Sequence, residues 1–320
     1  MNKDAKIYFA GHRGLVGSAI ERRLKADGYT NIITRTHKEL DLTNQAAVED
    51  FFAKEKCEYV FLAAAKVGGI VANSTYPADF IYLNTMISFN VIHTSYKHGI
   101  KKLINLGSSC IYPKFAPQPM KEEYLLKDYL EPTNEAYAVA KITAIKLCTY
   151  YNRQYGTNFL SVMPTNLYGP GDNYDLEGSH VLPALIRKFH EAKISGLDKV
   201  CLFGDGSPRR EFLFIDDLAE AVVMLMQKCN ANDLTNSAGD FINIGSGKDL
   251  TIKELAEKVK DIVYSDIPNR SCRIEWDTSK PNGTPQKLLD VSGMTAFGFS
   301  PKTEMIEGIK LAYSDFLNLP

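Results

Sequence analysis

Short apolar runs alternate with longer amphipathic segments through the first half of the chain, and this alternation limits the fold more than any other feature. The apolar runs have the length of buried strands, and the amphipathic segments have the length of helices. Strands joined by such helices form right-handed β–α–β units, whose strands lie parallel in one sheet. The expected strands are Lys6–Ala10, Asn31–Thr34, Tyr59–Ala63, Lys102–Leu106 and Phe159–Met163, and the expected helices are Val16–Ala26, Gln45–Lys54, Pro77–Lys97 and Glu135–Tyr155.

This regular pattern ends near Pro164, where turn-forming and polar residues begin. Further on, we expect a helix over Val181–Lys193, with Pro183 tolerated in its first turn, and an amphipathic helix over Met305–Phe316. The fold class is therefore α/β. We expect residues 1–165 to form a doubly wound parallel sheet, and residues 166–320 to form mainly a smaller α/β lobe over its carboxyl edge. A segment near 212–245 is expected to return to the sheet.

Composition excludes several classes of partner. The formal net charge is −1 and like charges form no long run, so the sequence indicates neither a nucleic-acid surface nor a membrane surface. The apolar run at Ile7–Ala10 is too short for a signal peptide or a membrane span. The six cysteines include no CxxC pair, so we expect free thiols, a cytoplasmic protein and no metal site.

A glycine-rich segment follows the first expected strand and opens the first expected helix: Gly11-His12-Arg13-Gly14-Leu15-Val16-Gly17. Glycines in this position permit a tight turn, close approach of the backbone to a diphosphate, and close packing of the helix on the strand. The positive helix N-terminus then attracts the diphosphate. The spacing is GxxGxxG, and its position between strand and helix predicts a dinucleotide site of the Rossmann type.

Residues after the second strand indicate which dinucleotide is bound. An NAD site usually carries Asp or Glu there for the ribose 2′-hydroxyl, whereas this chain reads Thr34-Arg35-Thr36-His37-Lys38. Arg35, with Arg13 of the glycine turn, favours a ribose 2′-phosphate and therefore NADP(H). The alternative is that Arg35 and Lys38 are only solvated surface charges. Asp41, followed by Leu42, is a candidate contact to the adenine.

Three polar residues carry the chemistry of a carbonyl. Tyr137 and Lys141 are four residues apart on an expected helix, so they share a face. An ammonium beside a phenol favours the phenolate, although lowering a phenol pKa from about 10 to about 7 requires about 4 kcal/mol. Ser108, after the fourth strand, provides a hydroxyl for the same carbonyl oxygen. Together they predict ketone reduction, and Cys110 beside Ser108 indicates an additional reaction.

These motifs resemble the extended short-chain dehydrogenase/reductase family over nearly the whole chain. Within that family, the likeness is to members that act on GDP-4-keto-6-deoxy-D-mannose as a 3,5-epimerase and an NADPH-dependent 4-reductase. The segments that carry it are Ala10–Gly14, Ala63–Ile70, Gly107–Pro113, Pro132–Lys141, Met163–Pro170, Ser179–Val181, Arg210–Phe212 and Lys287–Asp290.

The resemblance implies a role for each catalytic candidate. Cys110 and His180 are the base and the acid that invert C3 and C5, since a ketone at C4 acidifies the protons on both neighbours. Ser108 and Tyr137 hold the ketone oxygen, Tyr137 protonates it during reduction, and Lys141 holds the nicotinamide ribose. A thiol can be prepared for this role by nearby positive charge, and an imidazole donates protons readily near neutral pH.

The resemblance also implies the binding residues. For the cofactor they are Gly11, His12, Arg13, Gly14, Leu15, Val16, Gly17, Arg35, His37, Asp41, Leu42, Ala63, Ala64, Leu106, Gly107, Ser108, Lys141, Pro164, Thr165, Asn166, Leu167 and His180. For the nucleotide sugar they are Lys188, Phe203, Arg210 and Asn282. The chain departs from the family pattern at three of these positions: Phe203 replaces Trp, Asn282 replaces Asp, and His37 replaces Arg.

Alternatives remain open. The chain could be another nucleotide-4-ketosugar epimerase or reductase on the same scaffold, although a dehydratase would carry an acidic pair where Ser109-Cys110 stands. A plain 4-ketosugar reductase or a 4-epimerase needs neither Cys110 nor His180, and a non-catalytic cofactor sensor needs no proton machinery. In relatives, the helices at Pro77–Lys97 and Glu135–Tyr155 form a homodimer interface. The apolar residues that suggest this here are Leu83, Met86, Ile87, Val91 and Ile92.

Overall fold

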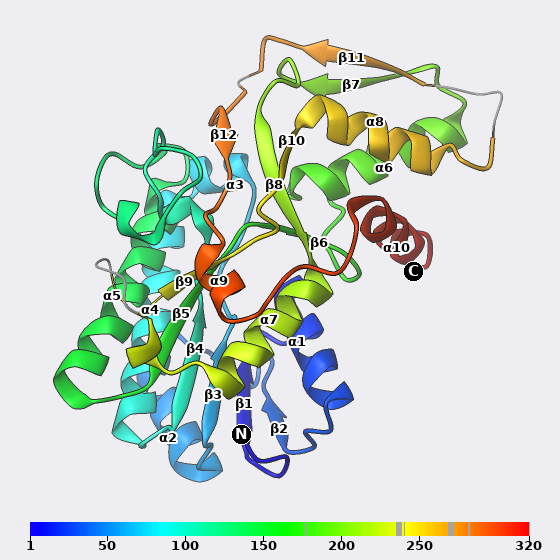
Figure 1. Ribbon diagram of the computed structural model, residues 1–320. Coiled ribbons are helices and arrows are strands. Elements are labelled where there is room, and N and C mark those ends of the chain that lie inside the picture. Colours follow the sequence, from blue (N-terminus) through cyan, green and yellow to red (C-terminus); the bar gives the residue numbers. More distant parts are fainter. Residues whose placement is uncertain (177, 235–238, 240, 268–271, 281, 320) are drawn as a thin grey trace.

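The computed structural model describes residues 1–320 except 177, 235–238, 240, 268–271, 281 and 320, and does not describe the side chain of Ile70. Part of the expected returning segment near 212–245, and Pro281 beside Asn282, therefore lie outside the described residues. A six-stranded parallel sheet lies at the centre of the larger of the two regions of the molecule (Figure 1). Its order is β2 (Ile32–Thr34), β1 (Ile7–Ala10), β3 (Tyr59–Leu62), β4 (Lys102–Leu106), β5 (Phe159–Pro164) and β9 (Phe241–Ile244).

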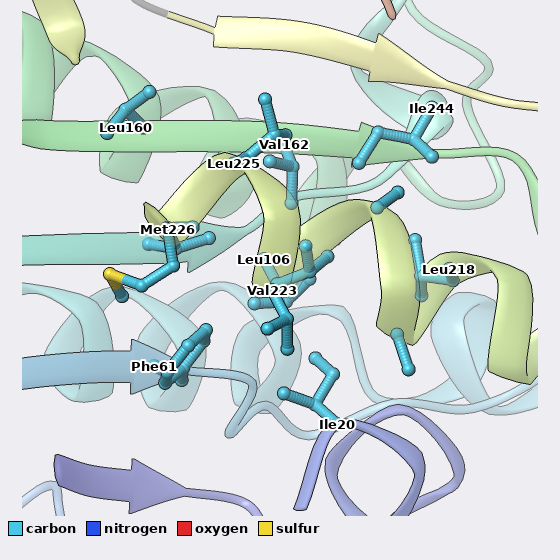
Figure 2. Packing of buried hydrophobic residues seen from close by; sticks show 14 of the residues in the cluster. Ile20, Phe61, Leu106, Leu160, Val162, Leu218, Val223, Leu225, Met226 and Ile244 are labelled. Atoms are coloured by element: carbon cyan, nitrogen blue, oxygen red, sulfur yellow. The ribbon is translucent and has the colours of Figure 1, made fainter. Parts of the chain in front are cut away.

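Helices cover both faces of this sheet, which confirms the doubly wound α/β fold. The helices are α1 (Leu15–Ala26), α2 (Gln45–Glu55), α3 (Ile70–Thr75), α4 (Pro77–Lys97), α5 (Glu135–Tyr155) and α7 (Ile215–Lys228). Alternation along β1 serves both faces: Ile7 and Phe9 pack in the cluster with α1 and α7, and Tyr8 and Ala10 pack in the cluster with α2, α4 and α5. Figure 2 shows the first cluster, where Leu225 and Met226 of α7 lie near Val162 and Phe61 of the sheet.

The remaining elements form a second region, drawn above the large sheet in Figure 1. Strand β8 (Arg209–Phe214) pairs with β10 (Asp249–Thr251), β12 (Gln286–Lys287) and β6 (Asn166–Tyr168), and β7 (Lys199–Phe203) pairs in parallel with β11 (Arg273–Asp277). Helices α6 (Val181–Ser195), α8 (Ile252–Val263) and α10 (Met305–Leu317) share a separate apolar core. The short helices α9 (Ser292–Ala296), η2 (Glu122–Tyr124) and η3 (Ala231–Asp233) complete the described elements apart from η1, given below.

Most expected elements occur at the predicted residues. The bounds of α4, α5 and β4 are those expected, and the other predicted helices and strands differ by one or two residues at their ends. Helix α3 was not expected; it ends at Thr75, and Pro77 occupies the first turn of α4, where a missing N–H costs nothing. No helix of the described residues has the length and apolar character needed to cross a membrane.

Parallel strands bring their carboxyl ends to one edge of the sheet. Gly11 follows β1, Ala63 follows β3, Gly107 follows β4 and Thr165 follows β5. In open α/β sheets, ligands bind outside this edge, where the strand order reverses. The residues that the sequence singles out therefore meet at the place where such a fold forms its site.

Candidate active site

The glycine turn after β1 has strict packing requirements. Gly11 has φ +92°, and a Cβ there would lie 2.6 Å from the backbone nitrogen of Ala64. A Cβ on Gly17 would lie 1.9 Å from the carbonyl oxygen of Gly11. Both contacts are too short for any side chain, so α1 lies directly against the turn.

Gly14 differs from its two neighbours in the motif. It is exposed, it is the N-cap of α1 with φ −77°, and a Cβ there would come no closer than 3.8 Å to the atoms around it. The first turn of α1 contains no acidic residue, and no side chain caps its amides. This exposed, positive helix end therefore fits a diphosphate. Around it, His12, Leu15 and Val16 are half-buried and Arg13 is exposed.

After β2, the structure differs from the expected pair of guanidinium groups. Arg35 turns back into the protein: Nη2 lies 2.6 Å from Glu55 Oε1, Nη1 donates to the carbonyl oxygen of Thr34, and the guanidinium lies over the ring of Phe51. An internal carboxylate has thus engaged the group assigned to the 2′-phosphate. Of that expected pair, only Arg13 is exposed.

The other candidates after β2 lie at the surface or beneath it. His37 and Lys38 are exposed, and His37 Nδ1 lies 3.8 Å from Asp41 Oδ1. Asp41 accepts hydrogen bonds from the backbone N–H and the hydroxyl of Thr43, which lower the pKa of its carboxyl. Leu42 is buried in the core cluster beneath α2, so its side chain serves packing.

The strand ends beside the glycine turn form the floor of the candidate site. Gly107 donates its N–H to the carbonyl oxygen of Val162 at 2.8 Å, and a Cβ there would lie 2.2 Å from the Met163 side chain. Beyond β5, the Thr165 hydroxyl and the Asn166 amide both donate to the carbonyl oxygen of Glu211. The remaining candidates continue this floor: Ala63, Ala64 and Leu167 are half-buried, and Leu106 and Pro164 are buried.

Ser108 and Cys110 lie together where β4 ends. Ser108 is the N-cap of the short helix η1 (Ser109–Ile111), and its hydroxyl accepts from the Cys110 backbone N–H at 3.4 Å. The Cys110 side chain is 8% exposed. Burial raises the pKa of the Cys110 thiol, while a hydrogen bond with Ser108 and the ammonium groups of Lys287 and Lys141 act in the opposite direction.

Tyr137 and Lys141 project from one face of α5 toward the same place. Lys141 Nζ donates to the carbonyl oxygen of Leu106 at 2.8 Å and lies 5.7 Å from the centre of the Tyr137 ring. Phe80 of α4 contacts that ring edge-on, with centroids 6.2 Å apart. Both Tyr137 and Lys141 interact electrostatically with Cys110. The structure therefore brings Ser108, Cys110, Tyr137 and Lys141 into one cluster.

The protonation of this cluster differs from the sequence expectation. Burial raises the pKa of Tyr137 well above its ordinary value, and Cys110 adds to the rise. Burial also lowers the pKa of Lys141 to about 8. The reason is geometric, because the ammonium bonds to the Leu106 carbonyl while the phenol is enclosed by protein.

His180 enters from the second region as the N-cap residue of α6. Its side chain is exposed, yet the surrounding protein lowers the pKa of the imidazole below its ordinary value. No hydrogen bond between described residues joins its imidazole to Cys110. The structure thus places His180 on a different element from the cluster, at the start of a helix that belongs to the second core.

The four residues expected to bind the nucleotide sugar also lie in this second region. Phe203, at the end of β7, is 64% exposed, and Lys188 Nζ lies 4.8 Å from its ring centre. Asn282 Oδ1 accepts from the backbone N–H of Asp205 at 2.9 Å. Arg210 of β8 is half-buried, and Gly283, next to Asn282, is close to its guanidinium. The flat exposed ring with cations beside it suits a nucleotide.

Three charged residues at the site were not assigned a role from the sequence. Lys280 Nζ lies 5.7 Å from the Phe203 ring centre, Lys287 acts electrostatically on Cys110, and Glu211 of β8 is fully buried. Lys280 and Lys287 flank the Asn282 segment in the sequence, so the positive charge of that segment could have indicated these two residues as part of the site. Glu211 carried no such signal, because its importance comes from backbone groups of distant loops.

Comparison with known proteins agrees with this geometry. Residues 7–245 match the family model described as the NAD dependent epimerase/dehydratase family. The chain is 55% identical to GDP-L-fucose synthase 1 of Arabidopsis thaliana, over 99% of this chain and 94% of that protein. It is 50% identical to GDP-L-fucose synthase of Escherichia coli K12, over 98% of this chain and 96% of that protein.

A solved structure shows the same fold. The GDP-D-glycero-L-gluco-heptose synthase of Campylobacter jejuni, solved in the presence of NADPH, aligns with a TM-score of 0.92. The two chains are 39% identical, and the alignment covers 99% of this chain and 100% of that one. These likenesses confirm the resemblance found in the motifs. The chain therefore belongs to the NAD dependent epimerase/dehydratase family, in the group that contains the GDP-L-fucose synthases.

Proposed function

We propose that the protein converts GDP-4-keto-6-deoxy-D-mannose to GDP-L-fucose by 3,5-epimerisation followed by NADPH-dependent reduction at C4. The observation that carries the proposal is the cluster of Ser108, Cys110, Tyr137 and Lys141 at the end of β4, where a potential base lies within electrostatic reach of the carbonyl-binding groups. The names of the relatives from Arabidopsis thaliana and Escherichia coli support it.

In the epimerisation, the Cys110 thiolate takes a proton from the carbon next to the ketone. The electron pair of the broken C–H bond moves to the ketone oxygen, which becomes an enolate oxygen, and Ser108 and Tyr137 donate hydrogen bonds to it. His180 delivers a proton to the opposite face, which inverts the centre, and the ketone re-forms. Repetition at the second neighbouring carbon completes the conversion.

In the reduction, the same oxygen pocket serves a second purpose. Bound NADPH supplies the hydride that C4 accepts. Tyr137 gives its phenolic proton to the oxygen, and the raised pKa of Tyr137 ensures that the phenol is protonated at neutral pH. Lys141 donates to the Leu106 carbonyl oxygen at 2.8 Å, and from this position at the end of β4 it would hold the nicotinamide ribose of the cofactor.

The cofactor is proposed to lie along residues 1–165, with its diphosphate at the start of α1. The exposed helix end at Gly14 and the required glycines at 11 and 17 support this placement. Arg13 supports NADP(H) by its exposure, and the relative from Campylobacter jejuni was solved in the presence of NADPH. Arg35 would have to leave Glu55 to bind a 2′-phosphate.

The nucleotide sugar is proposed to lie against the region formed mainly by residues 166–320. The base stacks on Phe203, and Lys188, Arg210 and Asn282 provide the polar contacts, with Lys280 added by its position over the same ring. The Asn282 carbonyl group is already bonded to Asp205, so the amide N–H₂ of Asn282 remains to meet a nucleotide acceptor.

The assembly proposed is a homodimer through α4 and α5. Two of the expected interface residues, Val91 and Ile92, are instead buried in the core, since they face the sheet. A cavity of about 350 Å³ nevertheless lies between these helices. Their outer faces also carry the exposed apolar residues Ile81, Tyr82, Phe89, Val139 and Tyr150. The cysteines of the described chain form no disulfide with one another, which supports a cytoplasmic location.

The test of the proposed function is NADPH oxidation with GDP-4-keto-6-deoxy-D-mannose, followed by NMR of the product sugar. We expect stoichiometric oxidation and a sugar of the L-galacto configuration. A product inverted at neither C3 nor C5 would identify a plain 4-ketosugar reductase, and no oxidation would reject both activities.

A further inference from the structure

Lys287 reaches the candidate site from β12, a two-residue strand far along the chain. In the parallel pairing of β12 with β8, Lys287 lies beside Arg210. Neighbouring residues in such a register project from the same face of the sheet. On the other side, Leu289, two residues after Lys287, packs in one apolar cluster with Ile111 and Tyr112, which directly follow Cys110. Lys287 therefore lies between Arg210, proposed to bind the nucleotide, and the segment that carries Cys110.

Charged groups surround Lys287 on several sides. Its ammonium interacts favourably with Cys110 and with Glu131, and unfavourably with Arg210. From the other direction, the Cys110 thiol meets Lys287 of β12, Lys141 and Tyr137 of α5, and Ser108 at the start of η1. Two cations from two different elements thus act on one buried sulfur atom. Since Lys141 is already bonded to the Leu106 carbonyl, Lys287 has the less committed ammonium.

Glu211 fixes the strand that carries Lys287. Its carboxylate is fully buried, and Oε2 accepts from the Leu289 backbone N–H at 2.9 Å while Oε1 accepts from the Gly247 backbone N–H at 2.7 Å. A Cβ on Gly245 would lie 2.2 Å from Oε1, so this loop has no room for a side chain. The carboxylate thereby joins β12 to the loop after β9.

A second set of contacts holds β12 from its other side. Leu288 accepts from the Met120 backbone N–H at 2.7 Å, and its own N–H donates to Gln118 Oε1 at 2.8 Å. The backbone groups of the two residues that follow Lys287 are therefore bonded to segments distant in the chain.

From this arrangement we propose that Lys287, held in register by Glu211, is a positioning residue that stabilises the thiolate of Cys110. The inference rests on the proposed role of Cys110 as the base of the epimerisation. An ammonium beside a thiol favours the thiolate, as at other reactive cysteines. Burial alone would leave Cys110 an inert thiol, so the positive charge opposes the effect of its enclosure.

The first experiment measures the thiol directly and needs no substrate. The full-length protein is treated with methyl methanethiosulfonate between pH 6 and 10, and mass spectrometry follows labelling of the tryptic peptide 103–114, in which Cys110 is the cysteine. We expect Lys287→Met to move the labelling profile upward by about one pH unit, which is about tenfold slower labelling at pH 8. Lys101→Met, an exposed lysine paired with Glu58, is the control and should leave the profile unchanged.

Glu211→Gln tests whether Lys287 must be held in position, because this variant weakens the contacts of the segment after β12 but keeps the Lys287 ammonium. Each carboxylate oxygen accepts one backbone N–H, and a glutamine amide can accept only one of the two. We expect an upward shift in the same direction as for Lys287→Met, with Lys287 still present. Circular dichroism and urea unfolding would establish that both variants are folded.

The second experiment uses solvent deuterium uptake at C3 and C5 of GDP-4-keto-6-deoxy-D-mannose. Lys287→Met should lower the uptake rate at saturating substrate about tenfold across the pH range in which wild-type uptake is flat. An unchanged labelling profile together with a raised KM would make Lys287 a substrate-binding residue and overturn the proposal. The labelling experiment requires no substrate. If Lys287→Met shifted the labelling profile as expected but the wild-type protein catalysed no deuterium uptake, the proposed function would be rejected instead.

Discussion

At the scale of single residues, the surrounding protein keeps the three proton-transfer groups of the site in their neutral forms. It raises the pKa of Cys110 and of Tyr137 and lowers that of His180. A neutral phenol suits the reduction, because Tyr137 must donate. The epimerisation needs the opposite forms of its two groups, a thiolate and an imidazolium, so the active combination is a small fraction of the enzyme at neutral pH.

This distribution predicts the pH dependence of deuterium uptake at C3 and C5. Below the pKa of His180, which lies under its ordinary 6.5, the thiolate fraction rises with pH and uptake rises with it. Above that value, the gain in thiolate and the loss of imidazolium cancel, until Cys110 titrates above its ordinary 9.0. We expect a flat region from about pH 6.5 to about pH 9. Uptake that still rises steeply between pH 7 and pH 8.5 would contradict these directions.

Replacing Cys110 by serine tests the base. A hydroxyl is a far weaker acid than a thiol, so Cys110→Ser should reduce deuterium uptake at C3 and C5 by at least about 10²-fold, while cofactor binding stays normal. Uptake is measured by NMR, and Cys201→Ser, at an exposed cysteine, is the matched control. Normal uptake in Cys110→Ser would remove this residue from the mechanism.

Replacing Tyr137 by phenylalanine tests the proton donor of the reduction. The ring and its contact with Phe80 remain, so the lost group is the hydroxyl alone. NADPH oxidation should fall about 10²- to 10⁴-fold. Tyr150→Phe, on the same helix and 55% exposed, should retain full activity. If both variants turned over at similar rates, the phenol would not be the donor.

At the scale of elements, the sequence was most informative where local pattern and tertiary packing agree. The long helices α4 and α5 and the buried strand β4 occur with the expected bounds, because their periodicity and their end signals coincide. Strand β12 has only two residues and exists through its pairing with β8, so no local pattern indicates it. The ion pair of Arg35 with Glu55 was also missed, since it joins β2 to the end of α2 across the fold.

The glycine turn gives a prediction at this scale, through a matched pair of variants. Gly17→Ala places a Cβ 1.9 Å from the Gly11 carbonyl oxygen. Its strain should outweigh a gain in helix propensity of about 1 kcal/mol and lower the free energy of unfolding by about 2 kcal/mol. Gly14→Ala has room, so its stability should change by less than about 0.5 kcal/mol while NADPH binding weakens.

Urea unfolding and calorimetric titration with NADPH measure these two effects separately. A Gly14→Ala variant that binds NADPH as tightly as the wild type would argue against a diphosphate at the start of α1. A Gly17→Ala variant of normal stability would show that α1 can move away from the turn.

At the scale of the whole molecule, most of the candidate site was predictable because parallel strands deliver their ends to one edge. Ser108, Cys110, Tyr137 and Lys141 meet there as expected, since each follows or faces a strand end. What the sequence could not supply was protonation, which depends on how much protein encloses Cys110 and Tyr137. Glu211 was beyond prediction for a related reason, because its partners are backbone N–H groups of segments distant in the chain.

The assembly is predicted to depend on the outer face of α4. Phe89 is 37% exposed and lines the cavity between α4 and α5, so Phe89→Glu would place a charge in the proposed interface. Light scattering should show a dimer for the wild type and a monomer for this variant. Phe115→Glu, at an exposed site outside these helices, should remain dimeric. A monomeric wild type would reject the homodimer.

Isotope labelling tests most directly whether one protein both epimerises the sugar, through Cys110 and His180, and reduces it, through Tyr137. The wild-type protein is incubated in deuterium oxide with GDP-4-keto-6-deoxy-D-mannose and NADPH, and the product is examined by NMR. We predict deuterium at both C3 and C5 of a GDP-L-fucose product, since Cys110 and His180 exchange each proton with solvent before C4 is reduced. A reduced product without deuterium at these carbons, and with both centres unchanged, would contradict the proposed roles of Cys110 and His180.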